Sequence, residues 1–405
     1  MSKLLPTHSF RWMTEEELMD WRNHPCILEV DLKYPHHLHD LYNDYPLALE
    51  ILNVDGVDKL KPNLHDKKKY VVHHEALKLY EVRGLVVTKI HRGITFEEST
   101  WLKPYIDLNT KLRAKATNDF EKNFFKLMNN SVFGKTMENI RKRVQIDLVN
   151  SEAKARKLIC QPNFNGYTIF CENLVAVHMK KTHLVINKPV YLGISILDLS
   201  KTLMYRFHYD YIKSMYDEKS KLLFTDTDSL MYEIETKDFH KDISPDVREM
   251  LDTSEYPEDH PSGIEVDVNK KVLGMFKVEV HGKQIDKFVG LRAKLYAYKM
   301  DEKRTVEGVE KDIVEKRCKG INKVVTKNNI TFDDYKNCLF NQKPQRRKMN
   351  VIRLYKHDVF SETINKVALS NEDGKWIIRE DGIHTYAHGH FRMKSGGNSV
   401  SSGAT

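Results

Sequence analysis

The sequence is poor in cysteine, and its cysteines stand far apart. Five cysteines are scattered over 405 residues, and no two of them form a C-x-x-C pair. Closely spaced cysteines hold most structural zinc ions and make up most disulfide frameworks. The pattern therefore argues against a zinc site or a disulfide framework. It predicts an intracellular protein of a reducing compartment, and a nuclear location is compatible with it.

Long apolar segments are also missing. No apolar run approaches the ~20 residues that a helix needs to cross a membrane, and the first residues, "MSKLLPTHSFRWM", lack the apolar stretch of a secretory signal. We therefore expect no membrane partner.

Acidic residues are scarce in one part of the chain. The whole sequence has a net charge of +8, but residues 316–356 hold many lysines and arginines with Asp333 and Asp334 as the only acids. Local clustering of positive charge points to a polyanionic partner more strongly than the average charge does. The length allows two or three domains.

Two carboxylates lie close together in "KLLFTDTDSLMYEI", residues 221–234. Asp226 and Asp228 are two residues apart at the crest of a predicted β-hairpin. Carboxylates that close raise each other's pKa unless a cation lies between them, and a divalent metal ion used for phosphoryl transfer would meet that need. A turn rich in Asp can also be purely structural. The apolar strands on both sides predict a buried sheet that holds the carboxylates rigidly, which favours metal ligands.

A basic helical segment is predicted from residue 109 to residue 143, with a break near Gly134. Lys122 and Lys126 are one helical turn apart and Arg113 precedes them, so one side of a helix presents several cations. Such a row suits a triphosphate, although a solvated basic helix has the same pattern. At the predicted break, Asn130 offers hydrogen bonds, Phe133 offers a flat stacking face, and Gly134 allows close backbone approach. This combination suits a nucleotide base. A second helix is predicted over 192–216 from its apolar periodicity.

Three motifs in this order resemble those of the family B DNA polymerases, in particular the protein-primed branch of adenoviruses, linear plasmids and Maverick (Polinton) transposons. "KLMNNSVFG", beginning at Lys126, is similar to motif B, K-x-x-x-N-S-x-Y-G, with Phe133 in the tyrosine place. "FTDTDS" is similar to motif C, Y-x-D-T-D-S, with Phe224 in the tyrosine place. Lys294 and Tyr296 match the K-x-Y motif.

The resemblance implies a role for each matching residue. Asp228 would be the main ligand of two Mg²⁺ ions (or Mn²⁺), with Asp226 beside it. The residues implied to bind the incoming deoxynucleoside triphosphate are Arg113, Lys122, Lys126, Asn130, Phe133 and Gly134. The residues implied to bind the primer and the DNA are Thr227, Lys294, Tyr296, Arg346, Arg347 and Lys348. The implied partners are a DNA template and primer, deoxynucleoside triphosphates and a priming terminal protein.

The resemblance also implies an α+β fold, the C-terminal part of a right-hand polymerase. It predicts a partial palm with an antiparallel sheet, helical fingers and a thumb. The implied regions are 1–105, an insertion-like region that reads as irregular; 106–143, the fingers with motif B; 144–190, an irregular insertion; 191–300, the palm with motif C and K-x-Y; 301–392, the thumb and C-terminal region; and 393–405, a disordered tail.

Motif A, which supplies the second essential aspartate of this family, has no good match. "EVDLKYP" offers Asp31, but its tyrosine follows after three residues and not after five, a shift of roughly 7 Å along a strand. We reject it, and expect that the chain starts just downstream of its own motif A and lacks the exonuclease domain. The predicted function is therefore a DNA-directed DNA polymerase, a nucleotidyltransferase of DNA replication, in a truncated copy that lacks motif A and the exonuclease domain. The alternative is an inactive DNA-binding remnant of a transposon or viral polymerase. A reverse transcriptase is disfavoured, because its hairpin normally carries Y-x-D-D.

Two histidine-rich segments, "YPHHLHD" and "HTYAHGH", imitate metal sites. Neither has a helical histidine pair with a nearby acid of the H-E-x-x-H type. We expect both to be surface loops.

Overall fold

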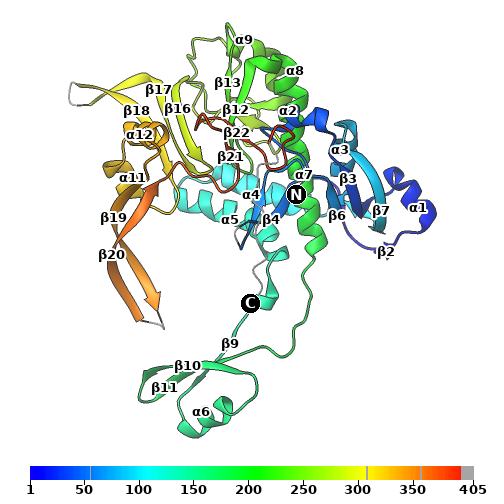
Figure 1. Cartoon of the computed structure of the whole chain (residues 1–405), viewed down its shortest axis with the longest axis vertical. Coiled ribbons are helices and arrows are strands. Elements are labelled where there is room, and N and C mark those ends of the chain that lie inside the picture. The colour runs from blue at the N-terminus through cyan, green and yellow to red at the C-terminus, as the bar shows by residue number, and fades with distance from the viewer. Residues whose placement is uncertain (55, 307–308, 356–357, 394–405) are drawn as a thin grey trace.

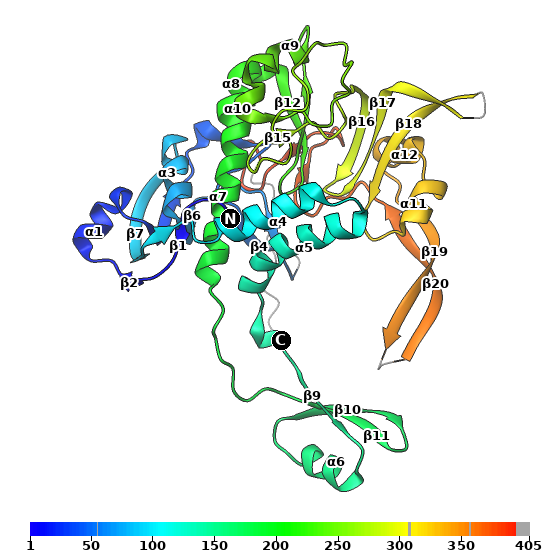
Figure 2. The ribbon, with the colours of Figure 1, turned by 180° about the vertical axis from the view of Figure 1, so that it is seen from behind.

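The computed structural model describes residues 1–54, 56–306, 309–355 and 358–393, and its fold is α+β, as predicted (Figures 1 and 2). Most of the predicted tail, 394–405, lies outside the described residues. No helix within the described residues combines the length and the apolar character that crossing a membrane requires.

The first region contains a four-stranded antiparallel sheet in the order β2-β7-β3-β6. Its strands are β2 (Arg11–Trp12), β7 (Val86–Thr95), β3 (Cys26–Lys33) and β6 (Lys67–His73). The helices α1 (Glu15–Met19), α2 (His39–Tyr42) and α3 (His74–Val82) accompany it. Two small antiparallel pairs complete the region: the hairpin of β4 (Glu50–Val54) and β5 (Val57–Lys61), and the pair of β1 (Leu5–Pro6) with the distant β8 (Glu98–Ser99).

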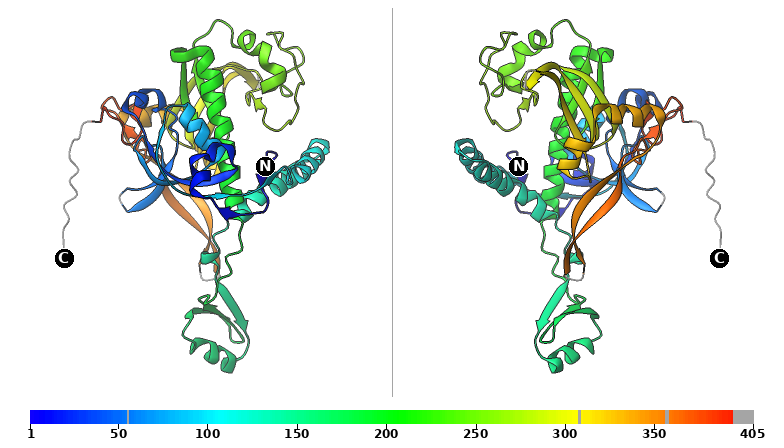
Figure 3. Two further views of the ribbon diagram at one scale, coloured as in Figure 1. Left: turned by 90° about the vertical axis from the view of Figure 1, so that its right-hand side faces the viewer. Right: turned by 90° about the vertical axis from the view of Figure 1, so that its left-hand side faces the viewer.

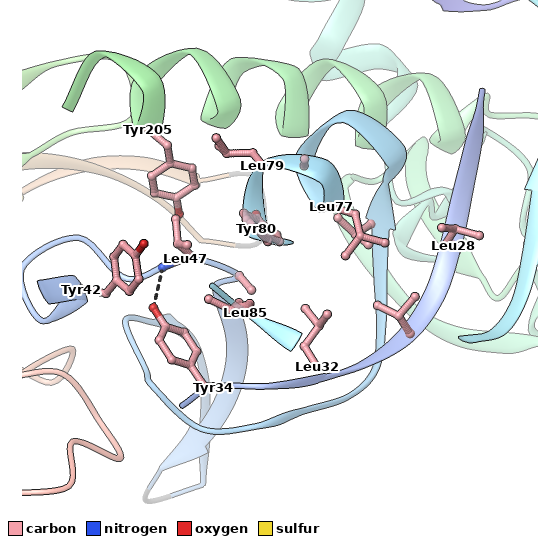
Figure 4. Packing of buried hydrophobic residues seen from close by; sticks show 14 of the residues in the cluster. Leu28, Leu32, Tyr34, Tyr42, Leu47, Leu77, Leu79, Tyr80, Leu85 and Tyr205 are labelled. Carbon is pink, nitrogen blue, oxygen red and sulfur yellow. Dashed lines mark hydrogen bonds between the residues drawn. The ribbon is translucent and has the colours of Figure 1, made fainter. Parts of the chain in front are cut away.

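The largest core of the molecule lies between this sheet, α3 and helix α7 (Val190–Arg206). In β3, Leu28 and Leu32 face the same side and are buried, which is the period-two pattern of a strand with one covered face. Figure 4 shows them packing toward Leu77 and Tyr80 of α3, with Tyr205 of α7 closing the core from above. The prediction that this region is irregular was wrong. Its strands are separated by long turn-rich segments, and their pairing, such as β3 with β7, is not visible in a local pattern.

Helices α4 (Lys103–Lys115) and α5 (Asp119–Thr136) form a hairpin that projects from the body (Figure 3). The side chain of Asn118 caps α5 by accepting a hydrogen bond from the Glu121 amide. The predicted break near Gly134 was wrong, because α5 continues through it to residue 136. A glycine within a helix costs only about 1 kcal/mol, and the neighbouring Phe133 offsets that cost by packing against a buried cluster around Leu192 and Ile196.

Residues 145–179 form a small separate module, which corrects the prediction of an irregular insertion. Its three-stranded antiparallel sheet has the order β10-β11-β9. The elements are β9 (Gln145–Val149), α6 (Glu152–Ile159), β10 (Phe164–Cys171) and β11 (Leu174–Met179). The module has its own core, which includes Val149 and Val177. Two connecting segments join it to the rest of the molecule, from which it lies apart (Figures 1 and 3).

The central region begins with α7. The helix continues through a π-helical stretch, Phe207–Ile212, into α8 (Lys213–Tyr216), so the predicted helix over 192–216 is confirmed. The hairpin of β12 (Ser220–Thr225) and β13 (Leu230–Ile234) follows. Short elements come next: α9 (Phe239–Ile243), α10 (Val247–Met250) and the parallel pair β14 (Leu251–Asp252) and β15 (Phe276–Lys277). An antiparallel sheet of β16 (Ile285–Arg292), β17 (Leu295–Val306) and β18 (Val309–Cys318) closes the region.

The C-terminal region contains α11 (Lys323–Asn329), α12 (Phe332–Asn341) and the long hairpin of β19 (Gln345–Tyr355) and β20 (Asp358–Leu369). The last strands, β21 (Ile377–Ile378) and β22 (Thr385–Tyr386), lead the chain back to the first region. There the two histidine-rich segments meet, because His39 accepts a hydrogen bond from the Phe391 amide, and His39 and His390 are buried. The expectation of two surface loops therefore holds for His36, His37 and His384, which are exposed, and was wrong for His39 and His390.

Candidate active site

The turn between β12 and β13, residues 226–229 (the motif C turn), holds the two predicted carboxylates. Asp226 and Ser229 exchange both backbone hydrogen bonds, at 3.0 and 3.3 Å, which closes a two-residue loop. Thr227 has a φ of +62° in this loop. A β-branched residue with a positive φ is strained, and such strain is concentrated at functional sites. The hairpin was predicted correctly, but its strands are not part of a buried sheet: their residues are half-buried, apart from the buried Ser220 and the exposed Lys221 and Glu233.

The two carboxylates have different surroundings. Asp226 is half-buried, and its Oδ1 lies 3.1 Å from the Nζ of Lys294. Asp228 is exposed, and its side chain has no hydrogen-bond or ion-pair partner among the described residues. One carboxylate is therefore neutralised within the protein, and the other is free to accept a cation.

An aromatic stack joins the hairpin to the K-x-Y segment (residues 294–296). The rings of Phe224 and Tyr296 lie 4.4 Å apart at 24°, and Phe288 of β16 stacks on Phe224 at 5.9 Å. Burial raises the pKa of Tyr296, so its phenol stays neutral. Lys294 occupies the tight turn between β16 and β17 with a φ of +62°. Motif C and K-x-Y thus form one site through an ion pair and a stack, and Phe224 contributes through its ring alone.

The basic face of α5 (Lys122, Lys126 and Asn130) follows the helical spacing that the sequence predicted. All three residues are exposed. Lys122 lies 3.6 Å from Asp119, whereas Lys126 and Asn130 have no side-chain partner among the described residues. Lys126 is therefore a cation available to an anionic ligand.

The other predicted nucleotide residues differ in their surroundings. Phe133 is half-buried against the cluster of Leu192 and Ile196, which restricts it as a stacking surface. Gly134 is exposed, and a Cβ added there would meet open space. Arg113, in the last turn of α4, has a neighbour that the sequence analysis missed: Lys271 donates a hydrogen bond of 3.4 Å to its carbonyl oxygen.

Lys271 adds a third positive charge beside Arg113 and Lys122. Burial lowers the pKa of Lys271, and the charges of Arg113 and Lys122 lower it further. Its backbone has a φ of +58°, and its amide is fixed by Asp252 at 3.0 Å. No sequence signal could have paired this loop residue with α4, because the contact joins segments that are far apart in the chain.

The predicted DNA-binding residues of β19 alternate between two faces. Arg346 and Lys348 are exposed, and Arg346 donates to the Asn365 carbonyl. Arg347 points inward, where it bonds the Asn329 carbonyl at 2.8 Å and lies 3.1 Å from Asp334. These contacts make Arg347 a structural residue of this hairpin and leave the outer pair available to a polyanion.

Asp31, which does not match the spacing of motif A, is engaged in hydrogen bonds within the sheet of the first region. Its carboxylate accepts a hydrogen bond from the Lys69 amide, pairs with Lys68 and bonds His91 at 2.8 Å. The backbone bond from Lys69 is the main reason that the pKa of Asp31 lies well below its ordinary value. A carboxylate engaged in this way is not free to bind a catalytic metal.

The described residues contain one convergent group of three potential metal ligands, and it lies outside the motifs. It consists of His73, His74 and Glu98. The adjacent histidines were a possible signal, but Glu98 is distant in the sequence. Two hollows of about 450 and 430 Å³ lie along α4 and between β4, β6 and α7, and no motif residue lines either of them.

Known protein structures share this fold. The Phi29 DNA polymerase complexed with primer-template DNA and incoming nucleotide substrates superposes with a TM-score of 0.55 at 15% identity, and its orthorhombic crystal form with a TM-score of 0.53 at 16% identity. The binary complex with primer-template DNA gives 0.51 at 17% identity. Each match covers 90–91% of this chain and 55% of the Phi29 polymerase, so the chain spans about half the length of that polymerase.

In the sequence comparisons no curated protein matches the chain, but a protein family does. Residues 1–214, more than half of the chain, match the family described as DNA polymerase type B, organellar and viral. The matched part includes the basic face of α5 and ends before the motif C turn. The chain belongs to the type B DNA polymerases of the organellar and viral kind.

Proposed function

We propose that this chain performs template-directed DNA synthesis by nucleotidyl transfer to a DNA primer or to the hydroxyl of a priming protein. The observation that carries the proposal is the union of the motif C turn with the K-x-Y segment, through the pair Asp226–Lys294 and the stack Phe224–Tyr296. The Phi29 structures hold primer-template DNA and nucleotides, and we propose the same classes of partner here. A protein-primed, transposon-type origin fits the motifs.

The carboxylates suit a hard divalent cation. Asp228 presents free oxygen atoms, which Mg²⁺ and Mn²⁺ prefer as ligands. Asp226 could bind the cation only when released from its ion pair with Lys294, so we assign Asp226 the lesser role as a ligand. A bound divalent ion would stabilise the charge that develops on the triphosphate during transfer.

The remaining residues have roles in binding and orientation. Lys126 contacts the triphosphate, and Lys122, Arg113 and Asn130 support it along the same helices. Lys294 would contact the primer terminus, and Tyr296 would hold the turn in place through its stack on Phe224. Arg346 and Lys348 contact backbone phosphates without preference for sequence.

A DNA-binding protein without polymerase activity is the second candidate, and one observation favours it. Among the described residues, no further carboxylate converges on Asp226 and Asp228, and Asp31 is occupied elsewhere. Two-metal sites usually take carboxylates from more than one chain segment. On this reading, the cations of α5 and β19 bind DNA but no transfer follows.

Primer extension with Mg²⁺ and with Mn²⁺ separates the two candidates. Asp228→Ala removes the free carboxylate, and Asp259→Ala is the matched control, because Asp259 is exposed and outside the site. We expect extension that is lost in Asp228→Ala and kept in Asp259→Ala, with equal DNA binding measured by fluorescence anisotropy. DNA binding without extension in the unmodified chain would support the second candidate. The absence of both would overturn the two proposals together.

A further inference from the structure

Two histidines and a glutamate meet at the junction of three parts of the fold. His73 ends β6, His74 begins α3, and Glu98 belongs to β8, just before α4. One potential ligand atom from each of the three side chains lies within 4.8 Å of the other two. None of these residues belongs to the polymerase motifs. This group is called the His-His-Glu cluster below.

The cluster is buried, and two of its polar atoms lack partners. The side chains of His73, His74 and Glu98 are 1%, 6% and 10% exposed. The Nε2 of His73 and the Oε1 of Glu98 face each other at 3.6 Å, too far apart for a hydrogen bond, and neither has another partner. A buried polar atom without a partner costs free energy, so each such atom needs an explanation.

His74 is oriented as metal-binding histidines usually are. Its Nδ1 lies 3.2 Å from the carbonyl oxygen of Cys26 and 3.1 Å from the Cys26 amide. Donation from Nδ1 to this carbonyl leaves a lone pair on Nε2 and fixes the ring, which is the usual support of a metal ligand.

We propose that His73, His74 and Glu98 bind a divalent transition-metal ion, Zn²⁺ by the chemistry of the donors. Two imidazoles and one carboxylate suit zinc, whereas Mg²⁺ prefers oxygen ligands alone. Water would take the fourth position. The thiol of Cys26 is not part of the cluster, and it donates a hydrogen bond of 3.8 Å to the carbonyl oxygen of Trp21.

Binding requires small local changes. Zinc bonds of ~2.1 Å place tetrahedral ligand atoms roughly 3.4 Å apart, close to the present separation of His73 and Glu98. His74 has to move inward. The Nδ1 of His73, which accepts a long 3.4 Å bond from the Glu75 amide, has to carry the proton instead, so that bond is lost. Glu75 also lies 3.5 Å from the Nε2 of His74, but it is paired with Lys78.

The position indicates a structural role. The backbone amide of His73 donates to Asp198 of α7 at 3.0 Å, and Glu98 stands shortly before Lys103, where α4 begins. A metal ion here would hold the sheet of the first region against α7 and the base of the α4–α5 hairpin. The proposal does not depend on polymerase activity.

The test uses the full chain, stripped with a chelator and dialysed against buffered micromolar Zn²⁺. Glu98→Gln and His74→Gln remove ligands. Glu97→Gln is the matched control, because Glu97 forms an exposed pair with His8 at the same 3.6 Å. We expect about one zinc per chain by mass spectrometry in the unmodified chain and in Glu97→Gln, and a loss of that zinc in both ligand variants. Free zinc at ~100 times the dissociation constant should raise the melting temperature by about 3–5 °C.

Each contrary result overturns the proposal. Less than a tenth of an equivalent of zinc in the unmodified chain, with no rise in melting temperature, leaves His73 and Glu98 as a buried polar pair. Equal zinc in the unmodified chain and in folded Glu98→Gln assigns the metal to other histidines. A rise in melting temperature with Mg²⁺ equal to the rise with Zn²⁺ contradicts the donor chemistry. Because the unmodified chain is measured directly, the test does not depend on the variants folding.

Discussion

The sheet of the first region and the motif C hairpin are both antiparallel, but they differ in how they are buried. In β3, Leu28 is fully buried in a core that extends over α3 and α7. The hairpin of β12 and β13 has two strands, most of its side chains are half-buried, and a stack of three rings supports it. The comparison separates two tasks: stability comes mainly from the covered sheet, and the proposed chemistry lies on a thin and accessible turn. Substitutions in the turn should therefore mainly lower the extension rate, whereas substitutions in the sheet should mainly lower the free energy of unfolding.

The largest expected effect concerns the two carboxylates of the turn. Asp228→Asn should lower the extension rate by ~100-fold or more, because Asp228 is the free carboxylate, whereas Asp226→Asn should lower it by roughly 10-fold. Neither substitution should change the urea midpoint of unfolding by much. Single-turnover extension and urea titration measure both quantities. A larger loss in Asp226→Asn would reverse the assignment of the main ligand.

In the covered sheet, a substitution should change stability and not the extension rate. Leu28→Ala should lower the free energy of unfolding by about 2–5 kcal/mol, because it leaves a cavity in a packed core. The extension rate per folded molecule should not change. Leu41→Ala, at a side chain that is 51% exposed, is the control and should cost less than about 0.5 kcal/mol. Equal losses of stability in the two variants would contradict the proposed division of tasks.

Acid should weaken the support of the hairpin. His208, in the π-helical stretch, contacts the Tyr232 hydroxyl of β13 at 2.9 Å, and burial lowers the pKa of His208 to about 3. The unfolded chain binds this proton near pH 6.5, and the folded protein does not. The contribution of His208 to the free energy of unfolding is therefore fully present above pH 6.5 and is lost as the pH falls below that value. The loss is about 2 kcal/mol between pH 7 and pH 5. Urea titrations at both pH values measure the loss. His208→Gln should reduce it, and an unchanged loss would assign it to other groups.

The smallest effect concerns the strain in the turn. Thr227→Gly should relieve the unfavourable φ of +62° and raise the free energy of unfolding by about 0.5–1 kcal/mol. Extension should fall, because the looser turn holds Asp226 and Asp228 less firmly. Gly166→Ala in the separate 145–179 module, where an added Cβ meets open space, is a control that should leave extension unchanged. Reduced stability in Thr227→Gly would show that the turn is not strained.

Local pattern was enough to predict several elements and failed for others. The hairpin around Asp226 and the helix from 192 to 216 follow from periodicity, because their hydrogen bonds lie within a short stretch of chain. The break at Gly134 was predicted from composition and is absent, since the packing of Phe133 outweighs one glycine. The 145–179 module was missed, because β9 pairs with β11 across a helix and another strand.

The sequence alone determined the motif residues, their order and the resemblance to a polymerase family, because these depend on residue identity and spacing. Only the tertiary structure decided which of those residues meet. It paired Lys294 with Asp226, turned Arg347 inward, placed Lys271 beside Arg113 and brought Glu98 to His73. Each of these contacts joins segments whose separation along the chain bears no relation to their distance in space. The physical reason is that burial and strand pairing act between distant segments, whereas sequence periodicity reports only on neighbours.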